Sequence, residues 1–201
     1  MTLFSLFLIF LVIINPLGNI QGFITATERL ADRRQKIVIL REMALAFGIM
    51  LAATFAGPAL LDILDVSDMA AFCGSGIILF LAAYRTLFPK QNHHELKREL
   101  KEPFLLPLAI PMIASPALLA TIMLYTSYAF SPSQVLGPLC AATLVSTLLL
   151  LFSRALRKIL GLSGLAAAEK LMGLVLILLA VQRILQGIIL FHANTIGATQ
   201  P

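Results

Sequence analysis

Six apolar stretches separated by short polar connections constrain the fold of this chain more than any other feature of its sequence. Each approaches or exceeds the ~20 residues that a helix needs to cross the hydrocarbon core of a bilayer. They cover residues 2–27, 37–61, 68–88, 103–130, 134–152 and 165–191. Because the chain has only 201 residues, little is left for a domain outside the membrane. We therefore expect an all-α polytopic membrane protein whose six transmembrane helices form one membrane domain, 1–201.

The composition excludes a water-soluble globule. Hydrophobic residues make up 59% of the chain and charged residues 12%, against roughly 45–50% and about 25% in soluble domains. The lipid bilayer is the expected partner. A net charge of +5 does not indicate nucleic acid, because no basic patch is interleaved with aromatic residues. Cys73 and Cys140 lie in separate apolar stretches without CxxC spacing, which favours packing roles for both.

The distribution of Lys and Arg predicts the topology. Every one of the 15 cations except Arg183 lies in or beside the connections 28–36, 89–102 and 153–164, whereas the connections 62–67 and 131–133 contain none. Short loops that carry Lys and Arg face the cytoplasm, so both termini are expected outside it, in a bacterial inner membrane. The first stretch has no basic segment before it and is interpreted as a retained helix.

The two halves of the chain contain a weak repeat. Asn15-Pro16 is echoed by Ser115-Pro116, and Arg85 by Arg183. The halves would be 1–88 and 103–201, joined by a cytoplasmic loop at 89–102. An odd number of helices per copy inverts the second copy in the membrane, an arrangement common among secondary transporters. The sequence therefore predicts two inverted three-helix repeats.

Proline and glycine interrupt the first and fourth apolar stretches near the middle of the membrane. Two interrupted helices at equivalent positions are a sequence pointer to a transport site, although a single break also occurs as a packing kink. Irregular backbone at this depth must be buried or line a polar cavity. The predicted substrate-binding residues are Asn15, Pro16, Gly18, Asn19, Ser115, Pro116 and Thr121.

Four further polar residues lie inside apolar stretches and leave two interpretations open. Glu42 is either an acid that couples ions to transport or an interfacial side chain that reaches for the membrane surface. Arg85 and Arg183 could attract a substrate carboxylate, or extend to the interface as long side chains do. Gln182 is either a second carboxylate-binding candidate or a partner for a neighbouring helix.

Other motifs indicate packing rather than chemistry. Ala44, Gly48, Ala52 and Ala56 form a small-residue stripe, which permits close helix approach and is compatible with a homo-oligomer. His94-Glu95-Leu96-Lys97-Arg98 lacks the second histidine of HExxH, and Gly74-Ser75-Gly76 is neither a P-loop nor a nucleophile elbow. We expect no enzyme, no catalytic residue, no metal site and no cofactor beyond a coupling H⁺ or Na⁺.

Several segments together resemble the MarC family of bacterial inner-membrane proteins. They are Asn15-Pro-Leu-Gly-Asn19, Arg41-Glu42, Gly76-Ile-Ile-Leu-Phe-Leu81 with Arg85, Pro103-Phe-Leu-Leu-Pro-Leu-Ala-Ile-Pro111, and Leu171-Met-Gly-Leu174 with Ala180-Val-Gln182. The resemblance spans all six stretches. It implies a six-helix protein of the lysine-exporter-like group, in which some members are described as transporters of glycine or alanine. This chain departs from the family pattern in having Ser115 where Gly is usual and Gln21 where Pro is usual.

Two functions are compatible with this sequence. The first is a secondary transporter for small polar solutes, such as neutral amino acids, in which Asn15, Asn19 and Ser115 bind the solute and Glu42 couples H⁺. Na⁺ held by backbone carbonyls freed near Pro16 and Pro116 is the alternative coupling ion. The second is a scaffold without transport, or an exporter of another metabolite.

Overall fold

The computed structural model describes residues 2–27, 32–88 and 113–197, which are almost entirely helical. The helices in these ranges are α1 (Leu3–Ile14), α2 (Pro16–Thr27), α3 (Asp32–Ile63), α4 (Asp68–Leu87), α5 (Pro116–Tyr128), α6 (Pro132–Leu151) and α7 (Ser153–Gly197). Five segments of the described chain are long and apolar enough to cross a membrane: Leu3–Ile20, Arg33–Ile63, Asp68–Leu87, Pro132–Leu151 and Ser163–Ala193. The expected all-α polytopic membrane fold is confirmed.

Polar residues at the helix starts explain where these apolar helices begin. The first N–H groups of a helix have no partner within it, and a Ser, Thr, Asn or Asp side chain satisfies one of them. Thr2 accepts from the N–H of Ser5 at 3.2 Å, and Ser67 accepts from that of Ala70 at 3.4 Å. At the start of α6, Gln134 Oε1 accepts from the N–H of Ser131 at 3.1 Å.

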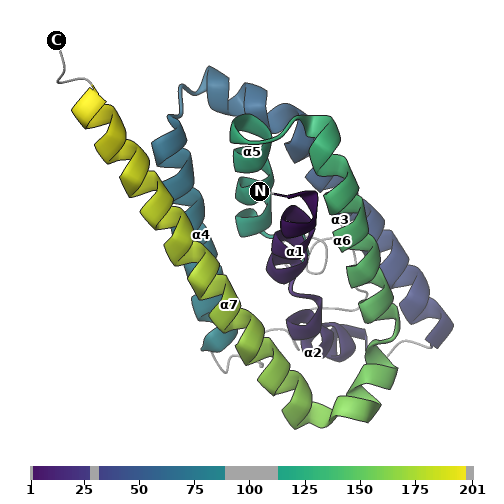
Figure 1. Cartoon of the computed structure of the whole chain (residues 1–201). Helices are drawn as coiled ribbons and strands as arrows, with labels where there is room; N and C mark the ends of the chain where they lie inside the picture. Colours follow the sequence, from purple (N-terminus) through teal and green to yellow (C-terminus); the bar gives the residue numbers. More distant parts are fainter. Residues whose placement is uncertain (1, 28–31, 89–112, 198–201) are drawn as a thin grey trace.

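Two helix pairs flank a central pair in this bundle. α7 packs along α4 on one side, α3 packs along α6 on the other, and the short helices α1 and α5 lie between them (Figure 1). α2 continues from α1 toward the lower end of the view and packs against α6 and α7. The core is formed where these faces meet, with side chains such as Phe10, Phe23, Met50, Leu79 and Leu139 fully buried.

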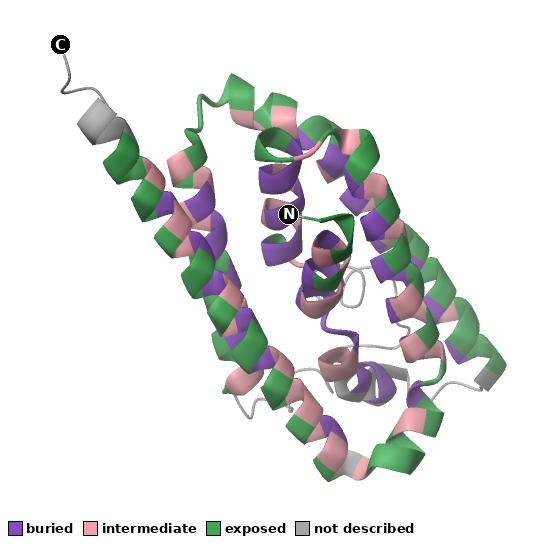
Figure 2. Cartoon of the chain, viewed as in Figure 1, coloured by how far each residue is buried: buried purple, intermediate pink, exposed green. Residues whose placement is uncertain are grey.

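The outer faces of the helices are apolar, as expected for contact with lipid. Figure 2 shows buried positions turned toward the centre of the bundle and exposed positions turned outward. Large side chains on these outer faces include Phe55, Phe80, Leu144, Leu178 and Ile189, all at least 40% exposed. In water such a surface would aggregate, whereas lipid tails solvate it.

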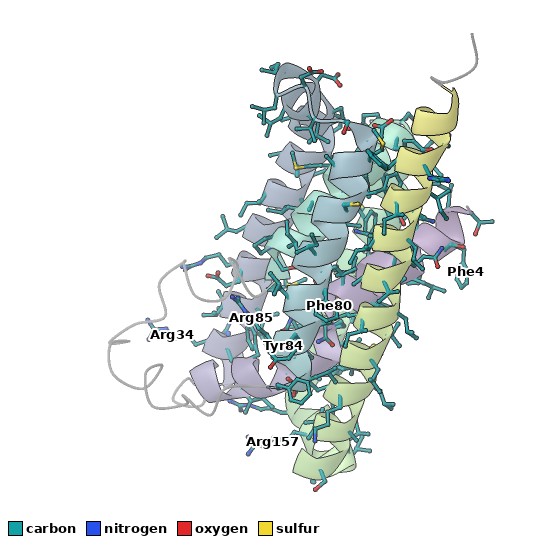
Figure 3. All side chains as sticks on the ribbon, turned by 90° about the vertical axis from the view of Figure 1, so that its left-hand side faces the viewer. Phe4, Arg34, Phe80, Tyr84, Arg85 and Arg157 are labelled. Carbon is teal, nitrogen blue, oxygen red and sulfur yellow. The ribbon has the colours of Figure 1, made fainter. Side chains whose placement is uncertain are left out.

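The charges separate along the bundle axis. Arg34, Arg85 and Arg157 lie in the lower half of Figure 3, whereas the connection between α3 and α4, which carries Asp65, lies at the top of Figure 1. This placement agrees with the cation pattern from which we predict the topology. Which end faces the cytoplasm stays a prediction.

Three predicted boundaries are wrong. Residues 32–36 and 62–63, placed in connections, are helical parts of α3, and 153–164 belongs to α7 and is helical apart from a kink at Gly161. In the last case a bend replaces the loop, because Gly161 has φ 67° inside α7, which glycine tolerates without steric cost. Polar residues at these positions indicated connections, but a helix that extends beyond the bilayer can carry charged residues and remain helical.

α4 and α7 approach closely through two glycines. A β-carbon at Gly76 would lie 2.8 Å from Cγ1 of Ile184 and 3.0 Å from the carbonyl oxygen of Ala180. One at Gly187 would lie 2.4 Å from Sγ of Cys73. The packing roles expected of Gly76 and Cys73 are therefore observed in the structure.

The small-residue stripe on α3 does not pack against the other described helices. Ala44, Gly48, Ala52 and Ala56 are all exposed, and a β-carbon at Gly48 would meet no atom within 4 Å. The close helix approach expected of this stripe therefore stays a prediction for a helix of another chain, because α3 turns its opposite face, with Met43, toward the core.

Candidate functional site

The first membrane-spanning segment breaks at Asn15, as predicted. Asn15 ends α1 with φ 48° and ψ 56°, the left-handed conformation, and α2 starts directly at Pro16. Both the strained dihedrals and the missing proline N–H prevent a continuous helix. Asn is among the few residues besides Gly that adopt this conformation routinely. The break therefore follows from the Asn-Pro pair itself.

Asn15 and Asn19 satisfy the backbone groups that the break exposes. Asn15 Oδ1 accepts from the N–H of Gly18 at 3.2 Å, and Asn19 Nδ2 donates to the carbonyl oxygen of Ile14 at 2.9 Å. Asn15 is buried, with 8% of its surface exposed, and Pro16 is buried beside it. The two amides predicted to face a solute thus first stabilise a helix end inside the bundle.

The predicted break at Ser115-Pro116 resembles the first one in the residues that follow it, which the structure describes. Ser115 precedes α5, Pro116 occupies its first turn, and Ser115 Oγ accepts from the N–H of Leu118 at 3.2 Å. Asn15 and Ser115 thus each bond to the N–H three residues later, at the start of a helix that begins with proline. Pro103, Pro107 and Pro111 lie outside the described residues.

Both capped helices start between the outer pairs of the bundle. α1 packs against α5, and Figure 1 shows the junction of α1 with α2 and the lower end of α5 inside the ring of longer helices. A helix N-terminus carries roughly half a positive charge and unpaired N–H groups. Each of these two ends favours the negative part of a solute.

Arg183 is buried and meets a predicted site residue. Its side chain is 3% exposed, and Nη1 donates to Thr121 Oγ1 at 2.7 Å. Its Cζ lies 5.2 Å from the ring centroid of Tyr125, one turn further along α5. Thr121 in turn donates to the carbonyl oxygen of Ala117. The guanidinium is therefore held by α5, and the interfacial alternative considered for Arg183 is wrong.

Glu42 is also inside the bundle rather than at the membrane surface. It is 1% exposed, Oε1 lies 3.3 Å from Nη2 of Arg41, and Oε2 has no hydrogen-bond partner among the described residues. The apolar part of α3 starts at Ile37, so Glu42 lies about 8 Å inside it at 1.5 Å per residue. Its burial favours the coupling interpretation, which stays a prediction.

Two buried hydroxyls on the neighbouring helices lack partners as well. Ser146 on α6 and Ser153 at the start of α7 are fully buried, and neither Oγ has a hydrogen-bond partner among the described residues. α3 packs against α6. Ser146 lies five residues before the end of α6, and Glu42 lies in the first third of α3. In Figure 1 the end of α6 lies beside the start of α3.

The structure separates two of the three predicted carboxylate-binding candidates from this interior. Arg85 and Gln182 are exposed on α4 and α7. Sequence reasoning underrated Arg183, which is buried, and missed Ser146 and Ser153. The signal for Arg183 was available, because it is the one cation set apart from the cationic connections. Nothing in the sequence distinguished Ser146 or Ser153 from other serines in apolar helices.

The match to known proteins covers nearly the whole chain. A family model described as MarC family integral membrane protein matches residues 1–191. The chain belongs to the MarC family. Because that match includes both broken helices together with Glu42 and Arg183, these features lie within the MarC part of the chain.

Several bacterial relatives of this MarC chain carry uninformative names. A UPF0056 membrane protein of Buchnera aphidicola subsp. Schizaphis graminum is 38% identical over 93% of this chain and 96% of its own length. The UPF0056 inner membrane protein YhgN of Escherichia coli K12 is 36% identical over 89% and 91%. A UPF0056 membrane protein of Chlamydia trachomatis is 30% identical over 89% of each chain. No solved structure matches.

Proposed function

We propose that this MarC protein is a secondary transporter of small polar solutes, with neutral amino acids such as glycine or alanine as the first class to test. The observation that carries the proposal is the pair of capped helix starts at Asn15 and Ser115, inside a membrane bundle. Discontinuous helices whose N-termini point at a substrate are the recurring binding element of secondary transporters. A merely structural bundle has no need for two such breaks.

The buried polar groups add a second line of support. Burying an unpaired polar or charged group in a bilayer is costly, so such groups within membrane helices mark transport pathways. Arg183 Nη2 and Glu42 Oε2 both lack hydrogen-bond partners among the described residues. We assign coupling to Glu42, which would take up H⁺ during the transport cycle. Na⁺ held by carbonyls around Pro16 and Pro116 is the competing assignment.

Reconstitution tests this proposal directly. Radiolabelled glycine and alanine are supplied to proteoliposomes under an imposed H⁺ or Na⁺ gradient, and wild type is compared with the double variant Asn15→Ala/Asn19→Ala. Gln182→Ala serves as the matched control, because Gln182 is polar and lies in a membrane helix but is exposed. We expect gradient-dependent accumulation in wild type and in the control, and its loss in the double variant.

One outcome would contradict the binding site, and another would contradict transport of this substrate class. Accumulation that survives the double variant removes Asn15 and Asn19 from the binding site. No accumulation of either amino acid by folded protein under any gradient removes the substrate class.

A second candidate function, a membrane scaffold, is favoured by the exposed stripe on α3. Ala44, Gly48, Ala52 and Ala56 form a smooth outward face that a helix of another chain, including a second copy of this one, could approach closely. Under this alternative Gly48→Leu abolishes the cellular phenotype while Asn15→Ala/Asn19→Ala preserves it. Transport predicts the reverse.

A further inference from the structure

Arg183 presents one side of its guanidinium without a partner inside the membrane. Ala193, the end of the apolar span, lies about 15 Å further along α7. Nη2 is inaccessible to solvent and has no hydrogen-bond partner among the described residues. An arginine at this depth is expensive and rarely occurs without a partner.

The described surroundings hold the guanidinium in place but do not compensate its charge. Thr121 Oγ1 accepts from Nη1 at 2.7 Å, and the ring of Tyr125 covers one side at 5.2 Å from Cζ. Thr121 is fixed by donating its own proton to the carbonyl oxygen of Ala117, so its lone pair faces Nη1. Neither group is an anion. A rigidly oriented guanidinium with an open donor is preorganised for an acceptor that arrives from outside the chain.

No acidic residue in the described part of the chain fills this role. Arg183 forms no ion pair there, and the one buried carboxylate, Glu42, is paired with Arg41. Among the described residues, no anion therefore balances the charge of Arg183.

We propose that Nη2 of Arg183, oriented by Thr121 and Tyr125, binds the carboxylate of the transported solute. This inference rests on the proposed transport function and specifies its substrate class: the solute carries a carboxylate, and its charge is recognised by α7 and α5. A carboxylate offers two oxygens that match the planar donor arrangement of arginine, whereas an amide group offers only one, uncharged acceptor.

The test compares ligands that differ only in this group. Binding of L-alanine, L-alaninamide, acetate and acetamide to the purified full-length protein in lipid nanodiscs is measured by titration calorimetry. We expect the two carboxylates to bind and the two amides to bind at least 10-fold more weakly. A hydrogen bond to a charged group is worth roughly a 10- to 100-fold change in the binding constant.

Variants locate the binding. Arg183→Gln is expected to weaken alanine binding roughly 10- to 100-fold, whereas Arg85→Gln, the exposed arginine at the corresponding place in the first half, leaves it unchanged. If Arg183→Gln does not fold, Thr121→Val takes its place. Thr121→Val leaves the charge of Arg183 in place and keeps the shape of the side chain at position 121, but it removes the hydrogen bond that orients Nη1. This variant should weaken alanine binding without changing that of alaninamide.

The results separate the two proposals. Equal binding of amides and carboxylates, wild-type affinity in the Arg183 variant, or no binding of either carboxylate to wild type overturns the carboxylate site. Carboxylate binding that depends on Arg183 but is accompanied by no uptake into proteoliposomes overturns transport and leaves the site. Uptake that does not depend on Arg183 leaves transport and overturns the site.

Discussion

A β-carbon at position 18 would lie 2.4 Å from Nδ2 of Asn15, the residue whose Oδ1 accepts from the N–H of Gly18 at 3.2 Å. The two residues thus depend on each other. The cap at the break forms only because position 18 has no side chain. Asn-Pro-Leu-Gly is therefore one structural unit in which the glycine makes room for the asparagine.

Gly18→Ala should displace the Asn15 side chain and remove its cap. We expect a loss of about 0.5–2 kcal/mol in the free energy of unfolding, the usual cost of an N-cap, together with reduced solute uptake. Unfolding in detergent, followed by circular dichroism, measures the first. Gly48→Ala is the control, because a β-carbon there meets no atom within 4 Å. Equal stability of the two variants would show that the cap contributes little.

Two substitutions at Asn15 separate its backbone role from its side-chain role. Asn15→Gly retains access to φ 48° without steric cost, whereas Asn15→Ala adds about 1–2 kcal/mol of strain to the loss of the cap. We expect the Gly variant to be the more stable in the same unfolding assay, while both lose uptake. Uptake retained by the Gly variant would show that the amide of Asn15 is not a ligand.

The close approach of α4 and α7 predicts that substitutions at two neighbouring glycines differ in their effect on stability. Gly76→Leu should destabilise the bundle by about 1–3 kcal/mol, since the added side chain meets the backbone of Ala180 and the side chain of Ile184. Gly74→Leu should be nearly neutral, because a β-carbon there meets nothing within 4 Å. Thermal unfolding in one detergent ranks the pair. Similar melting temperatures would contradict the packing of α7 on α4.

Glu42→Gln tests the coupling role. Glutamine keeps the shape and removes the charge, so a variant that still binds solute should exchange it across the membrane but no longer accumulate it against its gradient. Counterflow and gradient-driven uptake in proteoliposomes distinguish these activities. Asp62→Asn is the control, because Asp62 is an acid that lies exposed at the end of α3. Full accumulation by the Glu42→Gln variant would transfer coupling to Na⁺ at the helix breaks.

The topology prediction is tested at the C-terminus. A reporter enzyme that is active only outside the cytoplasm, fused after Pro201, should be active, since the Lys and Arg residues place both termini on that side. Moving the fusion point to Phe152, between α6 and α7, should abolish the activity. Activity at the second position only would invert the predicted orientation.

The sequence alone was sufficient for the fold class, the family and the first break. These depend on local or compositional properties: apolar length sets the membrane spans, and Asn15-Pro16 prevents a continuous helix wherever it occurs. Helix ends were less accurate, because Asp32 and Arg157 are compatible with both a loop and a helix that continues beyond the bilayer. The arrangement of all six spans as inverted repeats stays a prediction, since residues 103–112 lie outside the described part of the fourth span.

Tertiary structure decided which polar residues face the interior. Arg85 and Arg183 occupy corresponding places in the two halves, yet one is exposed and the other is bonded to Thr121. The same holds for Glu42. It is buried, although Ala44 and Gly48, only a few residues further along the same helix, are exposed. Periodicity shows that a helix has two faces, but only packing against α5 and α6 determines which face is buried. For that reason the sequence determined the elements of this protein, and the assembled bundle determined its candidate site.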